Sequence, residues 1–145
     1  MPAPIELILD PISLGVLALY AALMLWEALA PARRLPTIRG WHVRALTSFA
    51  VYFFLSSYLP LLWDASLAQY QLLDLSHMGA VSGAIVGLLA YNALLYAWHR
   101  SMHASPTLWR SFHQMHHSAA RIAAFGAFYF SPLDMIGFTF MGSLA

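Results

Sequence analysis

Residues 98–118 read WHRSMHASPTLWRSFHQMHHS and hold five of the seven histidines of the chain. The histidines are spaced H-x3-H and H-x2-H-H, so each set lies on one face if its segment is helical. Ser105 and Pro106 separate the two sets. Serine is a favoured N-cap and proline is accepted in the first helical turn, which predicts that a second helix begins here. Such a break allows the two histidine faces to turn towards each other.

The residue type and spacing of these histidines indicate a metal site. Neutral imidazole binds iron, zinc, copper and nickel, whereas calcium and magnesium prefer oxygen ligands. One histidine beside a membrane is usually a satisfied polar group, but five at ligand spacing favour metal ligation. The chain has no cysteine, which excludes thiolate ligands and disulfides. The candidate ligands are His99, His103, His113, His116 and His117.

The composition predicts an integral membrane protein. Of the 145 residues, 61% are hydrophobic and 9% are charged, whereas soluble domains carry about 25% charged residues. Three apolar runs are long enough to cross a bilayer core, which needs about 20 residues. We therefore expect an all-α membrane bundle that forms a single domain over residues 1–145. The expected spans are residues 12–30, 45–63 and 78–98, followed by the histidine-box region at 98–118.

The last segment, residues 122–145, is apolar but is interrupted at Ser131, Pro132 and Asp134. This interruption predicts a partial or re-entrant fourth membrane element rather than a regular span. The apolar run stops without a polar flank. We therefore expect the chain to be the N-terminal portion of a longer protein, truncated at its C-terminus.

The distribution of charge predicts the orientation in the membrane. With three spans, every basic residue falls on the side that carries the histidines, and four of the acids fall on the other side. The positive-inside rule then places the N-terminus outside and the histidine boxes in the cytoplasm. The basic residues are Arg33, Arg34, Arg39, Arg44, Arg100, Arg110 and Arg121, and the acids are Glu6, Asp10, Asp64 and Asp74.

Two further patterns lie on the third expected span. Gly79, Gly83 and Gly87 form a small-xxx-small row, which predicts a face where another helix packs closely. Asn92 and Tyr96 share a helical stripe with the first histidines. Metal-bound imidazoles generally donate their other N–H to an acceptor, and the stripe is a candidate for that role. Asn92 either lines a substrate channel or bonds to a neighbouring helix.

Over residues 98–118 the sequence resembles the fatty acid hydroxylase and sterol desaturase superfamily. Its integral membrane members carry three histidine boxes, H-x3-H, H-x2-H-H and a second H-x2-H-H. The first two match residues 99–103 and 113–117, and Ser118 follows as it does in the family. Residues 131–134, SPLD, resemble a variant of the family's His-Pro-Leu-Glu segment. No histidine follows residue 117, so the third box has no counterpart in this chain.

This resemblance implies a non-haem di-iron oxygenase that hydroxylates or desaturates a lipid. The implied cofactors are two iron ions, with zinc as a possible substitute, and O2 is the co-substrate. The implied partners are a lipid substrate, the membrane and an electron-donor protein, with no nucleic acid. A two-metal site at four to six ligands per ion needs about eight or more ligands. The centre is therefore expected to be incomplete in this chain.

Three alternatives remain open from the sequence. The first is an inactive fragment or pseudoenzyme with a partial metal site. The second is a haem-binding electron-transfer protein of the membrane, and the third is a protein with a zinc site. Axial haem ligands must oppose each other, which adjacent histidines such as His116 and His117 do poorly. A hydrolytic zinc site would be expected to contain the glutamate of H-E-x-x-H, and the sequence lacks this motif.

Overall fold

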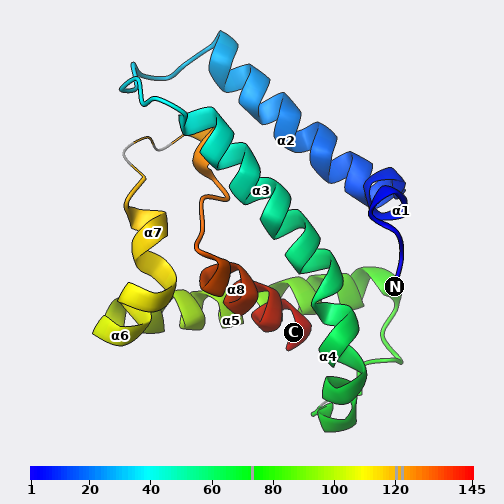
Figure 1. Cartoon of the computed structure of the whole chain (residues 1–145). Helices are drawn as coiled ribbons and strands as arrows, with labels where there is room; N and C mark the ends of the chain where they lie inside the picture. The colour runs from blue at the N-terminus through cyan, green and yellow to red at the C-terminus, as the bar shows by residue number, and fades with distance from the viewer. Residues whose placement is uncertain (73, 120, 122) are drawn as a thin grey trace.

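The computed structural model describes residues 1–72, 74–119, 121 and 123–145, and these residues contain helices but no strand, as predicted (Figure 1). The α-helices, in chain order, are α1 (Pro4–Leu9), α2 (Pro11–Leu29), α3 (Trp41–Tyr58), α4 (Pro60–Leu67), α5 (Ala80–Ala104), α6 (Pro106–Leu108), α7 (Gln114–His117) and α8 (Pro132–Ser143). Short turns of other helix types are η1 (Ala68–Tyr70), η2 (Trp109–His113) and η3 (Ala124–Gly126).

Three helical segments are long and apolar enough to cross a membrane, which confirms the predicted class. They are Pro11–Leu29, Trp41–Tyr70 and Ala80–Ala104. Their outer faces carry exposed leucines, as expected for side chains that meet lipid. The second segment extends beyond residue 63, where the sequence placed its end. Pro60 stands in the first turn of α4, where a missing N–H is tolerated, so the helical path continues from α3.

The chain from η3 to the start of α8 is held in place by the first two long helices. The Glu27 carboxylate of α2 accepts a hydrogen bond from the backbone N–H of Ala124 at 2.7 Å. The Ser48 hydroxyl of α3 donates a hydrogen bond to the carbonyl of Phe128 at 2.7 Å. The same hydroxyl accepts a hydrogen bond from the backbone N–H of Phe130 at 3.2 Å. These bonds satisfy backbone groups of an irregular segment and set where α8 begins.

Helix α8 packs against α3, α4 and α5 (Figure 1). Its 12 residues extend about 18 Å, well short of a hydrocarbon core of about 30 Å. It is thus too short to be a regular fourth span, as the sequence predicted. Gly137 allows its close approach to α5, because a Cβ atom there would lie 2.9 Å from Cζ2 of Trp98. That tryptophan directly precedes the first histidine of the site.

Among the residues that the structure describes, the glycine row at the start of α5 does not form the packing face that we predicted. An ideal Cβ at Gly79, Gly83 or Gly87 would meet no atom within 4 Å in the described part of the chain. Close packing occurs instead at Gly126, against Trp41, and at Gly137. Spacing along one helix shows that a face is smooth, but it does not show whether another helix covers it.

The two kinds of glycine predict different responses to alanine. Gly137→Ala overpacks the contact with Trp98, and we expect a loss of stability of about 1–3 kcal/mol. Gly83→Ala is the matched control, since its Cβ enters open space, and it should leave stability unchanged or slightly raised. Thermal unfolding of the detergent-solubilised protein measures both. A lower melting temperature for Gly83→Ala than for Gly137→Ala contradicts this packing.

Candidate metal centre

The chain turns sharply between the two histidine sets, as predicted. Helix α5 ends at Ala104, and Ser105 takes an extended backbone conformation. The Ser105 hydroxyl accepts a hydrogen bond from the N–H of Leu108 at 3.4 Å, and Pro106 opens α6. The next turn, η2, is a π-helix, a form that occurs often at functional sites. It directs the second histidine set back towards α5.

Four histidines from the two sets converge. One ring nitrogen from each of His99, His103, His113 and His117 lies within 4.8 Å of the others. The Nε2 atoms of His99 and His103 are 3.0 Å apart, and those of His113 and His117 are 3.1 Å apart. The ring centroids of His99 in α5 and His113 in η2 lie 4.4 Å apart. His113 is fully buried, whereas His103 and His117 are exposed.

The geometry of this four-histidine cluster fits a transition-metal ion. Nitrogen ligands stand about 2.0–2.1 Å from zinc, so neighbouring ligands of a tetrahedral ion lie about 3.3 Å apart. The closest pairs in the cluster approach that separation. Burial, followed by the neighbouring imidazoles, lowers the pKa of His113 to about 4. Burial and His103 also lower the pKa of His117. Both rings are therefore neutral at pH 7, as metal ligation requires.

His116, the fifth predicted ligand, lies beside the cluster but outside it. Its ring centroid is 5.2 Å from that of His113 and 5.3 Å from that of His117. The ring packs instead against Phe130 at 4.8 Å. Its Nδ1 is buried and has no hydrogen-bond partner among the residues that the structure describes. The predicted set of five is thus arranged as four nitrogens together and one apart.

Asp134 of α8 contacts the cluster, a role that the sequence analysis did not assign. Its Oδ2 lies 3.1 Å from Nδ1 of His113, and both side chains are fully buried. Burial raises the pKa of Asp134 to about 7. Ser131, at the N-cap of α8, donates its hydroxyl to the carbonyl of Phe112 at 2.7 Å. Two hydrogen bonds therefore join η2 to the start of α8. The SPLD segment at residues 131–134 was the feature of the sequence that could have indicated this role of Asp134.

Asn92 and Tyr96 do not bond to the histidines in the described structure. Asn92 is exposed and donates its amide N–H to the carbonyl of Leu88 in its own helix at 2.7 Å. The Tyr96 hydroxyl accepts a hydrogen bond from Arg100 at 2.8 Å. Within the described ranges, neither role that we considered for Asn92, in a channel or in a bond to a neighbouring helix, is observed. A polar side chain on a helix can donate its hydrogen bond to a backbone carbonyl in the preceding turn of the same helix.

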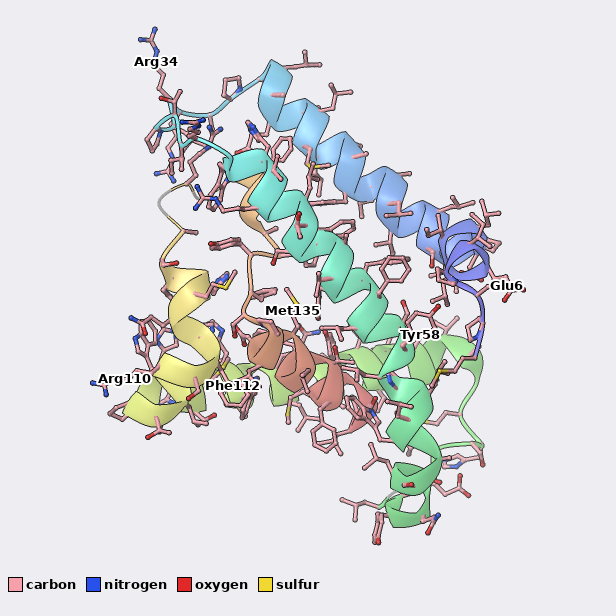
Figure 2. All side chains as sticks on the ribbon, in the orientation of Figure 1. Glu6, Arg34, Tyr58, Arg110, Phe112 and Met135 are labelled. Atoms are coloured by element: carbon pink, nitrogen blue, oxygen red, sulfur yellow. The ribbon has the colours of Figure 1, made fainter. Side chains whose placement is uncertain are left out.

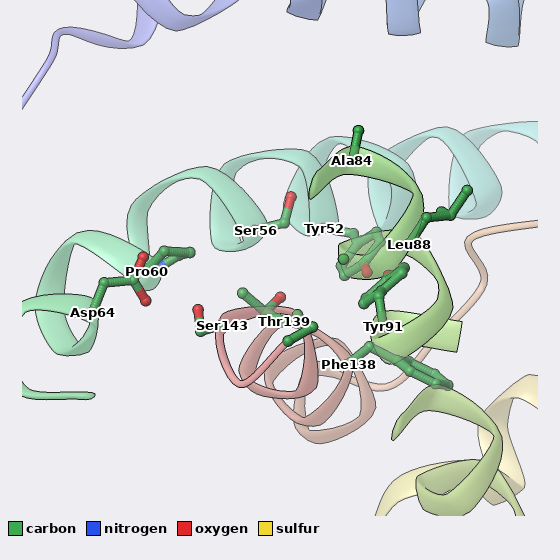
Figure 3. A pocket seen from close by; sticks show the side chains of 13 residues that line it. Tyr52, Ser56, Pro60, Asp64, Ala84, Leu88, Tyr91, Phe138, Thr139 and Ser143 are labelled. Carbon is green, nitrogen blue, oxygen red and sulfur yellow. The ribbon is translucent and has the colours of Figure 1, made fainter. Parts of the chain in front are cut away.

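A cavity of about 680 Å³ lies between α3, α4, α5 and α8 (Figure 3). Its wall includes Tyr52, Tyr91 and Phe138, together with small side chains of α5 and α8. The Phe130 ring, which packs against His116, also contacts Phe138 at 5.2 Å and Tyr52 at 5.8 Å. An aromatic layer thus connects the cavity wall to the histidine region.

Comparison with known proteins finds similarity over the part of the chain that carries these features. The model of the fatty acid hydroxylase family matches residues 84–145, which include both histidine sets and Asp134. The chain is 31% identical over 64 residues to cholesterol 25-hydroxylase of Rattus norvegicus, and equally so to that of Mus musculus. The alignments cover 44% of this chain and 22% of each relative. No solved structure is significantly similar. The resemblance to the fatty acid hydroxylase and sterol desaturase superfamily is confirmed over residues 84–145.

Because His116 lies apart from the cluster, we expect alanine variants of His113 and His116 to differ in metal binding. We expect the purified chain to retain about one equivalent of Co²⁺ or Zn²⁺ after dialysis. His113→Ala should lose this metal, because it removes a nitrogen from the cluster and leaves Asp134 unpaired. His116→Ala should retain the metal. His42→Ala, a control variant outside the histidine cluster, should retain it as well. Metal per protein, measured by mass spectrometry, checks this, with circular dichroism to verify folding. Equal losses in His113→Ala and His116→Ala contradict the arrangement.

Proposed function

We propose that this chain serves the oxidation of a lipid C–H bond, by hydroxylation or desaturation, at a non-haem iron centre. The observation that carries the proposal is the four-histidine cluster, which lies at the end of a long apolar helix. The fatty acid hydroxylase match over residues 84–145 supports a lipid substrate. The matched relatives are named for a sterol hydroxylation. The matched region covers only 22% of each relative, so activity is proposed for the whole protein.

The ligands that we propose are the five histidines of the sequence analysis. His99, His103, His113 and His117 would hold one ion, and His116 would belong to the ligand set of a second. When bound, iron supplies the activation of O2 that oxidation of an unactivated C–H bond requires. In hydroxylation one oxygen atom enters the lipid and the other leaves as water, and external electrons and protons complete the balance. Zinc fits the same nitrogens but supplies no redox chemistry.

The chain itself supplies the nitrogen ligands and excludes water from one side of the four-histidine cluster. His113 stays neutral and buried, and α8 covers it, whereas His103 and His117 face outward. The wall of the cavity is mostly apolar, with Asp64 among its polar members, and suits a lipid that enters from the bilayer. Arg100 and Arg110 are exposed on the segments that carry the histidines. We propose that they attract an acidic electron-donor protein, because complementary charge speeds such encounters.

The geometry of the cluster disfavours a haem site. Axial imidazoles of a haem stand on opposite faces of a plane, whereas these four nitrogens converge within 4.8 Å. A non-catalytic chain that binds metal without turnover is the second candidate, and its support is that the described residues bring together the nitrogens for one ion.

Oxygen incorporation tests the proposed activity. The purified whole protein, loaded with Fe²⁺ and supplied with a reductant, ¹⁸O₂ and a membrane lipid extract, should yield lipids that carry ¹⁸O or a new double bond. His113→Ala should yield neither. Mass spectrometry of the lipids provides the measurement, and His42→Ala is the control. Iron that binds in stoichiometric amounts without any lipid product refutes the enzymatic proposal and supports the non-catalytic candidate.

We propose further that the histidine boxes face the cytoplasm and the N-terminus faces outward. Arg34 and Arg110 lie at one end of the molecule, and Glu6 lies at the opposite end (Figure 2). This separation supports the orientation that the positive-inside rule predicts.

Because the chain lacks cysteine, single cysteines test this orientation without background labelling. Ser76→Cys and Thr107→Cys place exposed thiols at opposite ends of α5. In intact spheroplasts an impermeant maleimide should label Ser76→Cys and spare Thr107→Cys until the cells are lysed. The reverse pattern of labelling overturns the proposed orientation.

A further inference from the structure

The two ring nitrogens of His113 have different neighbours. Nδ1 lies 3.1 Å from Oδ2 of Asp134, and Nε2 lies 3.1 Å from Nε2 of His117, inside the four-histidine cluster. A neutral imidazole carries one proton, on one nitrogen or the other. Nε2 has a lone pair for an ion only when the proton is on Nδ1. The environment of Nδ1 therefore determines whether His113 can act as a ligand.

The position of Asp134 in α8 makes its bond to His113 informative. Asp134 is the third residue after the Ser131 N-cap, and its backbone N–H donates to the Ser131 hydroxyl at 3.1 Å. A carboxylate at this position ordinarily turns back to the N–H of the N-cap residue, which completes a capping box. Here it points to His113 instead. The carboxylate is therefore not used to begin its own helix.

Burial adds a second constraint. Asp134 and His113 are both fully buried, and Oδ1 of Asp134 has no hydrogen-bond partner among the described residues. A buried carboxylate is unfavourable unless hydrogen bonds or a positive charge compensate it. The cluster next to His113 is where a cation would lie. A polar residue without a role at this position would cost stability for no gain.

We propose that Asp134 is a positioning residue of the metal centre: it accepts the Nδ1 proton of His113 and thereby presents Nε2 to the ion. This inference rests on the proposed metal site and extends it to a residue outside both histidine boxes. The orientation of the ring follows from the same bond, because Ser131 and Asp134 together hold η2 against α8. The acceptor for the ligand thus comes from a helix distant in sequence rather than from α5.

The test compares Asp134→Asn with Met135→Leu in the full chain. Asparagine keeps the volume of Asp134, but its amide can present either a donor or an acceptor to Nδ1. Met135 is the buried neighbour on α8, and leucine there controls for altered packing. Two measurements are made at pH 8. They are the Co²⁺ affinity, from the visible spectrum, and the proton position on His113, from ¹⁵N spectra of histidine-labelled protein.

We expect wild type and Met135→Leu to carry the His113 proton on Nδ1 and to bind Co²⁺ equally. Asp134→Asn should bind Co²⁺ about 10- to 100-fold more weakly, the usual effect of losing such an acceptor. Its His113 should show a larger share of the Nε2-protonated form. A merely structural role would not move that proton.

Three results would overturn the inference. In the first, Asp134→Asn keeps the wild-type Co²⁺ affinity and the wild-type position of the His113 proton. In the second, Met135→Leu loses as much affinity as Asp134→Asn, which assigns the loss to packing. In both cases the metal site itself stands. In the third, wild type binds no Co²⁺, and the metal site of the proposed function fails together with the role of Asp134.

Discussion

The buried hydrogen bond between His113 and Asp134 joins the two parts of the structure on which the site depends. One partner lies in the π-helical turn after α5, and the other lies in the first turn of α8, 21 residues later. A buried polar pair is stable only when its members find each other, so it demands an accurate approach of α8. Gly137 permits that approach against Trp98.

The hydrogen bonds of the irregular segment before α8 serve the same end. α2 and α3 bond to residues 124–130 through Glu27 and Ser48, so the long helices determine where α8 begins. The site is consequently supported by the whole bundle, although its nitrogens come from a short stretch of chain. One side of the four-histidine cluster is covered by α8, and the other side is open at His103 and His117. That asymmetry suits a centre that needs both a dry side and access.

Sequence reasoning worked where the physical cause is local. Periodicity placed His99 with His103 on one helix face, and the N-cap preference of Ser105 located the break. It failed where the cause lies between helices. The glycine row of α5 has the spacing of a packing face, yet the described chain leaves it open. Gly137 carries no repeated pattern, and its importance comes from the tryptophan opposite it.

The sequence alone determined the all-helical membrane class, the candidate ligands and the turn that brings two histidine faces together. These features follow from hydropathy, helical period and capping, each of which acts over a few residues. Only the tertiary structure decided that His116 stands apart and that Asp134, rather than Asn92, meets a ligand. Such pairings depend on how helices cross. Crossing is set by the contacts of side chains far apart in the chain, and no local pattern encodes it.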